Sequence, residues 1–343
     1  MNKRYLGKGI SLFAGCGGDT LGMENAGIKV VGFVEFWDKA INTHKLNFPN
    51  AEFIGEKWGG NITKIPDKEF LKFKGKIYVI FAGFPCQGFS HAGKKDPKDK
   101  RNKLFWEFVR ATRLIQPRWI IGENVAGLVH RKTDDGKNKV SKVIVSAFEE
   151  IGYKMAEPMV LKAEEYGIPQ KRRRVFFVGN RIKKTFKFPD QEKIRVSLRG
   201  IIEDDLDNAI RFKLQIKDMP PSKIYEIKKN ILVNGKPHPY LLRKLKDGKV
   251  SFKKRISPFH VEVVDLDSPT KTIHCGYSFQ PRLFVLLKKD KEIFIRPFNT
   301  RELAQIQGFP KGYKFYGKEE DIIKQIGNAV PPLLVTKIVK NIL

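Results

Sequence analysis

The sequence predicts an α/β protein in which a doubly wound, mostly parallel sheet forms a large domain and a second, smaller domain follows it. Three observations predict this fold. Short apolar runs of strand length alternate with stretches of helical spacing as far as about residue 185. The first apolar run leads through a glycine turn directly into a helix-like stretch. Beyond about residue 185 the alternation fades, and short basic and aromatic pieces replace it.

The large domain opens with a strand, a glycine turn and a helix. Residues 9–14 predict the strand, Gly15-Cys16-Gly17-Gly18 the turn, and residues 20–26 the helix, which Gly27 closes. Glycines in such a turn let a ligand approach the backbone closely. Taken alone, the pattern is consistent both with a cofactor site and with a purely structural turn.

An acidic residue after the second strand favours the cofactor site. Residues 29–34 form another apolar run, and Glu35 follows it about 20 positions after the glycine turn. A carboxylate at this spacing is placed to accept hydrogen bonds from a ribose. A helix over residues 38–46 then leads to Asn61-Ile62, which ends the next crossover.

Cys86 lies just beyond the fourth predicted strand, residues 76–81, which stops at Gly83 before Pro85. Open α/β sheets place ligands and chemistry at the carboxyl ends of their strands. Cys86 is therefore either a nucleophile with a stabilised thiolate or a small buried thiol that fills a gap. For the polar, basic residues 87–103 we expect a mobile loop that closes over the site, although a plain solvated connection also fits.

Two further charged groups are expected at the same rim. A helix over residues 104–115 precedes a strand over residues 118–122, which delivers Glu123 at its carboxyl end. Glu123 is either a salt-bridged scaffold group or an acid/base residue. After a helix over residues 141–151, Arg172-Arg173-Arg174 enters a strand over residues 175–179. Alternation places Arg172 and Arg174 on one face, where they anchor phosphates or a carboxylate unless the run is merely solvated.

The C-terminal part predicts two helices joined by a turn. The first runs from Thr300, as its cap, to Gln307, and residues 325–332 turn into a final helix over residues 333–342. The basic and aromatic pieces before them indicate loops and short strands that carry much of the contact with nucleic acid.

Charge and cysteine content narrow the function classes. The 343 residues carry a formal net charge of +29, which favours a polyanion partner, nucleic acid first, over a lysine-rich thermophilic surface or an anionic membrane. The three cysteines lie far apart without zinc-ligand spacing, so we expect no metal and a reduced cytoplasmic protein. Neither a signal peptide nor an apolar run of about 18 residues is seen, so no membrane segment is expected.

These motifs, taken together, resemble the cytosine-C5 DNA methyltransferases. The similarity runs in order from Ser11 to Pro332 and rests on Phe13-Ala14-Gly15-Cys16-Gly17-Gly18, Gly83-Phe84-Pro85-Cys86-Gln87-Gly88-Phe89-Ser90, Glu123-Asn124-Val125, Gln170-x-Arg172-x-Arg174, Arg301-Glu302 through Gln307-Gly308-Phe309-Pro310, and Gln325-Ile326-Gly327-Asn328-Ala329-Val330-Pro331-Pro332. Asn61 departs from the family, which usually has an aspartate near the adenine of S-adenosylmethionine.

The resemblance implies a methyltransferase fold, with a catalytic domain over residues 1–185 plus 320–343 and a target-recognition domain over residues 186–319. It implies covalent catalysis by Cys86 on a cytosine flipped out of duplex DNA, with Glu123 at N3 and the exocyclic amine and with Arg174, or Arg172, at O2. The methyl donor is S-adenosylmethionine and the product S-adenosylhomocysteine. We expect a monomer that is the modification half of a restriction–modification pair.

The resemblance also implies two sets of binding residues. The cofactor set is Phe13, Ala14, Gly15, Gly17, Glu35, Phe36, Asn61, Ile62, Gly83, Pro85, Leu104, Asn328 and Val330. The DNA set is Gln87, Ser90, Lys94, Arg101, Gln170, Tyr277 and Arg282. Cys16 is expected to be a small packing residue.

Two alternative functions fit these motifs less well. A tRNA cytosine-C5 methyltransferase of the same fold usually carries a Cys-Phe-Thr tripeptide, which this chain lacks. A catalytically dead DNA-binding module is disfavoured by the intact set of Cys86, Glu123 and the arginines.

Overall fold

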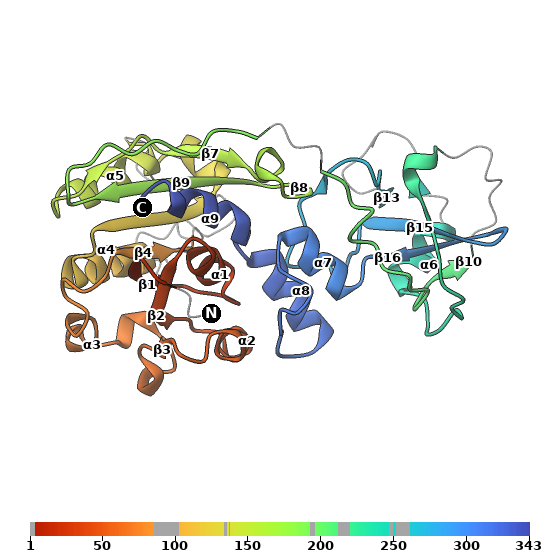
Figure 1. Ribbon diagram of the computed structural model, residues 1–343, viewed down its shortest axis with the longest axis horizontal. Helices are drawn as coiled ribbons and strands as arrows, with labels where there is room; N and C mark the ends of the chain where they lie inside the picture. The colour runs from red at the N-terminus through yellow and green to blue at the C-terminus, as the bar shows by residue number, and fades with distance from the viewer. Residues whose placement is uncertain are drawn as a thin grey trace.

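Two sheets organise the chain, one in each half of the molecule (Figure 1). The computed structural model describes residues 4–85, 103–133, 136, 138–192, 196–211, 220–246, 250–251 and 261–343. The larger sheet has eight strands and the smaller has six, and a two-stranded ladder links β8 (Gln170–Lys171) to β14 (Thr270–Lys271). No helix within these ranges is both long and apolar enough to cross a membrane.

The larger sheet has the order β3-β2-β1-β4-β5-β9-β6, with β7 also paired to β9. The first five of these strands run parallel, and β9 runs antiparallel to β5. The prediction of a doubly wound, mostly parallel sheet is confirmed. The strands are β1 (Gly7–Leu12), β2 (Ile28–Val34), β3 (Glu52–Phe53), β4 (Val79–Ala82), β5 (Trp119–Val125), β6 (Lys154–Met155), β7 (Met159–Lys162) and β9 (Arg173–Asn180).

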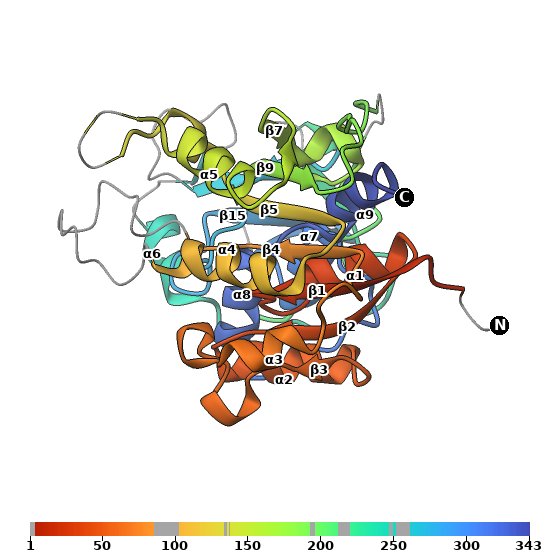
Figure 2. The same ribbon diagram turned by 90° about the vertical axis from the view of Figure 1, so that its left-hand side faces the viewer.

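Strict alternation along the central strands builds two separate hydrophobic layers. Ile80, Ile120 and Phe177 point to one face, and their neighbours Phe81, Ile121 and Phe176 point to the other. The first face is covered by α3 (Asp67–Leu71), α4 (Lys103–Ile115) and α5 (Val140–Glu149), which face the viewer in Figure 2. The second face is covered by α1 (Gly18–Asn25) and α9 (Pro332–Lys340). α2 (Asp38–Asn47) connects β2 to β3.

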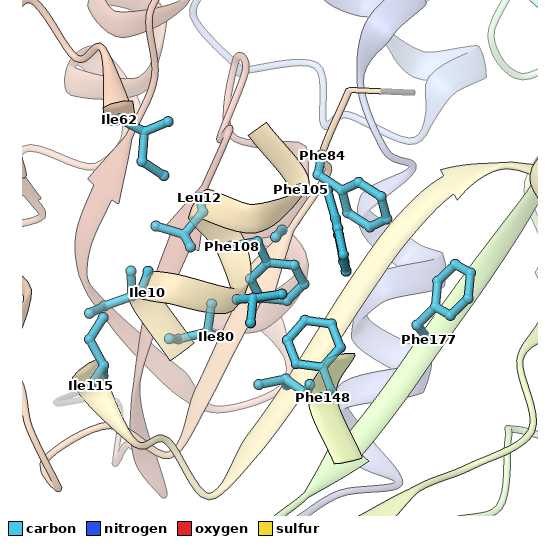
Figure 3. Close-up of a cluster of buried hydrophobic side chains, with 14 of the residues drawn as sticks. Ile10, Leu12, Ile62, Ile80, Phe84, Phe105, Phe108, Ile115, Phe148 and Phe177 are labelled. Atoms are coloured by element: carbon cyan, nitrogen blue, oxygen red, sulfur yellow. The ribbon is translucent and has the colours of Figure 1, made fainter. Parts of the chain in front are cut away.

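An aromatic cluster fixes the end of β4 in the first layer. The ring of Phe84 lies 5.6 Å from Phe105 and 6.4 Å from Phe177, measured between centroids, and Phe108 and Phe148 continue the cluster (Figure 3). Burying a phenylalanine contributes about 1.5–3 kcal/mol. The backbone that leads out of β4 is therefore anchored by its own side chain.

Two predicted strand ends are wrong by a few residues, and each difference has a local cause. Phe13 has a left-handed φ of 57°, which ends β1 at Leu12 and puts residues 13–14 in the turn. β5 continues to Val125 because its pairing with β9 continues to that residue, so Glu123 lies inside the strand rather than after it.

The smaller sheet lies within residues 210–297. Its order is β10-β16-β15-β13-β12, with β11 beside β15. The sequence predicted only loops and short strands here, yet β15 and β16 have seven and six residues and bury most of their side chains. The elements are β10 (Ile210–Arg211), β11 (Ile224–Glu226), α6 (Pro239–Lys246), β12 (Val250–Ser251), β13 (Val261–Val263), β15 (Leu283–Lys289) and β16 (Glu292–Pro297).

The C-terminal helices correct two further predictions. α7 (Thr300–Gln307) is capped by Asn299, whose side chain accepts from the Glu302 backbone while Glu302 accepts from the Asn299 backbone, so Thr300 is not the cap. The predicted turn at residues 325–332 begins inside α8 (Glu319–Asn328).

α9 packs closely on α1 because α1 has a glycine at the contact. A Cβ atom on Gly22 would lie 2.5 Å from the Cβ atom of Val335, and the Thr336 hydroxyl donates to the Gly22 carbonyl over 3.1 Å. This close packing brings the segment between α8 and α9 back to the carboxyl ends of the parallel strands.

Candidate active site

The candidate site is a cavity of about 730 Å³ at the rim where the parallel strands end. Leu12, Val34 and Ala82 are in register at the ends of β1, β2 and β4, and β5 ends beside them. Because β9 is antiparallel to β5, its first residues lie at this rim as well. Open α/β sheets bind their ligands at this position.

A buried ion pair lies at the β5–β9 side of the cavity. Arg174 Nε lies 2.7 Å from Glu123 Oε1. The two residues share a face because Arg174 pairs with Val125, two positions after Glu123, so their side chains are diagonal neighbours across the ladder. Glu123 is only 7% exposed, and this burial raises its pKa, while the charges of Arg174 and then Arg172 offset part of the rise.

The segment that leads to Cys86 is held on both sides. The Phe84 ring is packed into the aromatic cluster, and the amide of Asn124 donates to the Phe84 carbonyl over 2.9 Å. Asn124 in turn accepts from the Val125 backbone N–H. Cys86 itself lies outside the described residues, but Gly83 and Pro85 line the cavity immediately before it.

The two predicted catalytic arginines have different surroundings. Arg174 lines the cavity, whereas Arg172 is 1% exposed and donates to the backbone carbonyls of Ile273, Gly327 and Ala329 over 2.9–3.3 Å. Burial, and next the charge of Arg174, lower the pKa of Arg172 to about 9, so it remains charged at neutral pH. Through these hydrogen bonds Arg172 connects the segment between β8 and β9 to the C-terminal segment that lines the cavity.

Glu35 organises the other end of the cavity. Its Oε2 accepts from Gly15 N–H at 2.7 Å, and its Oε1 accepts from Phe36 and Trp37 N–H at 2.8 Å each. A carboxylate can accept about four hydrogen bonds, so one acceptor position remains for a ligand hydroxyl. Phe36 is 72% exposed at the cavity, which leaves an aromatic surface for a ligand to cover.

Asn61 lies in the same region and uses its side-chain oxygen locally. Oδ1 accepts from the Thr63 backbone over 3.2 Å and from the Thr63 hydroxyl over 2.8 Å, which caps the 3₁₀ turn over Ile62–Lys64. The amide N–H₂ group stays available. Asn61 therefore presents a hydrogen-bond donor to the cavity.

Of the thirteen residues predicted to bind a cofactor, twelve line the cavity. The other, Gly17, lies between Cys16 and Gly18, which both line it. Gly17 has a φ of 88°, and a Cβ atom there would lie 2.6 Å from the Phe48 ring, so this position requires a glycine. The twelve are Phe13, Ala14, Gly15, Glu35, Phe36, Asn61, Ile62, Gly83, Pro85, Leu104, Asn328 and Val330.

The residues predicted to contact DNA are mostly interior or outside the described ranges. Gln170 is fully buried and bonds Gln307 and the Ile273 N–H, and Tyr277 is 5% exposed and bonds the Leu283 carbonyl. Neither side chain presents a surface to a duplex, so these two assignments are replaced by structural roles. Arg282 is partly exposed and donates to Gln280 over 3.0 Å. Gln87, Ser90, Lys94 and Arg101 lie outside the described residues.

Sequence reasoning missed four polar residues of the cavity, namely Asp19, Asn124, Lys324 and Gln325. Asn124 follows Glu123 in a motif, and that position was the available signal. Asp19 directly precedes the helix predicted over residues 20–26, and its contact with Ser11 joins two segments that the sequence does not place together. Lys324 lies over the Trp37 ring at 4.6 Å, a contact between residues distant in the chain.

The lining fits S-adenosylmethionine in three respects. Glu35 offers an acceptor for a ribose hydroxyl, Phe36 offers an open ring for adenine, and the turn around Gly15 lets backbone approach the methionine part. A metal site is not indicated, since no group of three or more metal-ligating side chains occurs within the described ranges.

Comparison with known proteins agrees with this geometry. Residues 7–343 match the sequence profile of the C-5 cytosine-specific DNA methylases. The type II methyltransferase M.PspPI of Psychrobacter sp. (strain TA137) is 32% identical over 97% of this chain and 78% of its own length, and M.FnuDI of Fusobacterium nucleatum is 33% identical over 97% and 93%. A mutant of DNMT2 from Spodoptera frugiperda shares the fold with a TM-score of 0.69 at 18% identity, covering 98% of this chain and 99% of its own.

Proposed function

The chain belongs to the C-5 cytosine-specific DNA methylases, and from this membership we propose how its cavity methylates cytosine. It is a DNA cytosine-5-methyltransferase of the restriction–modification type. We propose that it acts as a cytoplasmic monomer on one short sequence of duplex DNA and protects that sequence from a partner endonuclease. The observation that carries the mechanism is the buried Glu123–Arg174 pair in the same cavity as Glu35 and the segment ending at Pro85.

S-adenosylmethionine is the methyl donor that this family implies, and it leaves as S-adenosylhomocysteine. We assign its ribose to Glu35 and its adenine to the space between Phe36 and Asn61. The sulfonium would supply a methyl group to a carbon nucleophile, with the thioether of S-adenosylhomocysteine as the leaving group. The other residues that would line the bound cofactor are Phe13, Ala14, Gly15, Ile62, Gly83, Pro85, Leu104, Asn328 and Val330.

Cytosine C5 is a poor nucleophile, and the protein has to activate it. Addition of the Cys86 thiolate to C6 forms a carbon–sulfur bond and moves the C5=C6 electron pair towards C5 and N3. Glu123 is placed to donate a hydrogen bond or proton to N3 as negative charge develops there, which its raised pKa favours. Arg174 is placed to stabilise the charge on O2. After methylation, a base such as solvent water takes the C5 proton, and the Cys86 thiolate leaves from C6, which restores the ring.

A cytosine stacked in a duplex cannot enter this cavity, so the base must be flipped out of the helix. We propose that residues 1–185 and 320–343 form the catalytic domain, and that residues 186–319, which contain the smaller sheet, read the target sequence. The net charge of +29 supports binding to the phosphate backbone, and base-edge contacts from the second domain provide specificity.

The cofactor assignment is tested at two adjacent glycines. A Cβ atom on Gly60 would lie 1.7 Å from the Glu35 carbonyl oxygen, whereas a Cβ atom on Gly59 would meet nothing within 4 Å, although both glycines have positive φ. Gly60→Ala must therefore displace Glu35, and we expect it to weaken binding of S-adenosylhomocysteine at least about tenfold. Gly59→Ala is the control and should cost only about 1 kcal/mol of stability. Isothermal titration and thermal unfolding measure both effects, and equal binding losses would refute the assignment.

The activity itself is tested with labelled S-adenosylmethionine on duplex DNA and on tRNA. We expect label in duplex DNA, as 5-methylcytosine. Sequencing methylated cytosines after expression in an unmethylated host should then show one short sequence context. Label in tRNA alone would indicate an RNA methyltransferase, and turnover on neither substrate would indicate a binding module.

A further inference from the structure

A buried carboxylate in the cofactor cavity has no place in the mechanism above. Asp19 is 4% exposed and lines the cavity in the first turn of α1. Its Oδ2 accepts a short hydrogen bond from the hydroxyl of Ser11, which is itself fully buried. Among the residues that the structure describes, no lysine or arginine forms an ion pair with Asp19. An unpaired buried carboxylate is costly, so a cationic partner is to be expected.

The fold explains why the Ser11–Asp19 pair lies at this point. Ser11 is in β1 beside Phe33 and Phe81 of the flanking strands and points to the face covered by α1. The turn over residues 13–17 then folds back, so the first turn of α1 lies over the end of the strand that precedes it. A serine at an otherwise apolar position provides the single hydroxyl that orients Asp19.

The charges of the cavity favour a cation beside Asp19. The carboxylates of Asp19, Glu35 and Glu123 line it together with two cations, Arg174 and Lys324, of which Lys324 lies over the Trp37 ring. Arg174 compensates Glu123, and three backbone N–H groups hold Glu35. Asp19 accepts hydrogen bonds from Ser11 and from backbone N–H groups, but in the described part of the chain no cationic side chain pairs with it, and it lies next to the glycine turn.

We propose that the Ser11–Asp19 pair binds the α-ammonium group of the methionine part of S-adenosylmethionine. With the ribose at Glu35 and the methyl group directed towards Glu123 and the target base, the amino-acid end lies at the turn over residues 13–18, where Asp19 is found. The ammonium supplies the missing counter-charge, and a charge-assisted hydrogen bond to Asp19 fixes the orientation of the methionine chain. This inference rests on the proposed cofactor site.

The proposal is tested with three ligands that differ in charge. S-adenosylmethionine carries both sulfonium and ammonium, S-adenosylhomocysteine carries only the ammonium, and 5′-methylthioadenosine carries neither. We expect Asp19→Asn to weaken the first two equally, by roughly 10- to 100-fold, and to leave the third unchanged. Asp38→Asn is the matched control, because Asp38 is also a first-turn acid after a strand of this sheet but does not line the cavity.

Each other outcome overturns a stated part of the proposal. Equal loss for all three ligands would show that Asp19 acts on the fold alone. Loss for S-adenosylmethionine only would assign the contact to the sulfonium. Unchanged binding of S-adenosylhomocysteine would reject the subsite while leaving the cofactor site intact. Failure of the wild-type protein to bind any of the three would instead reject the proposed function. Ser11→Ala, which keeps the carboxylate, should weaken the two ammonium ligands less than Asp19→Asn does.

The pH dependence of binding provides a second readout. Burial raises the pKa of Asp19 to about 7, and its hydrogen bonds with Ser11 and the backbone partly offset that rise. A cation binds the carboxylate form, so affinity for S-adenosylhomocysteine should fall as the pH drops from 8 to 6, and this slope should disappear in Asp19→Asn.

The titratable groups around Asp19 are Cys16, Glu35, His44, Glu123 and Tyr313. Burial keeps His44 neutral, with a pKa of about 3, and raises the pKa of both Cys16 and Tyr313, so none of these three accounts for the slope.

Discussion

Cys86→Ser is expected to abolish methyl transfer to duplex DNA while leaving the affinity for S-adenosylhomocysteine unchanged. The serine hydroxyl stays protonated at neutral pH and does not add to C6, so C5 is never activated. The loss should exceed about a thousandfold, because removing a covalent nucleophile removes the whole pathway rather than one stabilising contact. Transfer of labelled methyl groups measures the first effect and titration calorimetry the second.

A covalent trap makes this prediction specific to Cys86. When the target base is 5-fluorocytosine and S-adenosylmethionine is present, methyl transfer gives an adduct whose C5 carries fluorine and methyl but no proton, so the bond between Cys86 and C6 cannot be broken by elimination. The wild-type protein should form a complex with that duplex that survives denaturing electrophoresis, and Cys86→Ser should form none. Cys275→Ser is the matched control, because Cys275 is an exposed cysteine whose backbone packs on Gly327 of the cavity. A trapped complex in Cys86→Ser, or its loss in Cys275→Ser, would contradict the assignment.

The parallel sheet could be predicted because its signal is local. For example, β2 and β4 are mainly apolar runs of seven and four residues, and Glu35 and Gly83 follow them directly. The glycine turn and Glu35 lie at a spacing that the fold itself imposes. The same locality explains why boundaries were less accurate. The left-handed φ of Phe13 and the continued pairing of β5 depend on neighbours that the local sequence does not specify.

The polar contacts of the site could not be predicted in the same way. Strand alternation predicts that Arg172 and Arg174 share a face, yet Arg172 lies between β8 and β9 and binds three backbone carbonyls, whereas Arg174 binds Glu123. The difference arises because the C-terminal segment at Gly327 and Ala329 returns to cover Arg172 only. Similarly, Gln170 looks like a surface residue in the sequence, but it is buried against Gln307, which is 137 positions away.

Glu123→Gln is expected to lower kcat by about 10²–10⁴-fold, with little change in the affinity for S-adenosylhomocysteine. The amide cannot transfer a proton to N3 as the thiolate adds to C6. Glu107→Gln is the matched control, since Glu107 also pairs with an arginine, at 2.6 Å from Arg110, but lies outside the cavity. A Glu123→Gln enzyme that keeps more than half of the wild-type rate would remove Glu123 from the mechanism.

The pH–rate profile shows which protonation state of Glu123 is active. Burial raises the pKa of Glu123, and the charge of Arg174 opposes that rise. If the protonated acid is the active form, the rate falls as the pH increases through this pKa, and the falling limb is absent in Glu123→Gln. Arg174→Gln removes the opposing charge, so the pKa rises further and the falling limb should move to higher pH, even though the loss of the contact with O2 lowers the maximal rate. A limb that moves to lower pH in Arg174→Gln would show that another group controls the profile. Single-turnover rates between pH 6 and 9 give both the position of the falling limb and the maximal rate. The position reports the electrostatic effect of Arg174 on Glu123, and the maximal rate reports its contact with the substrate.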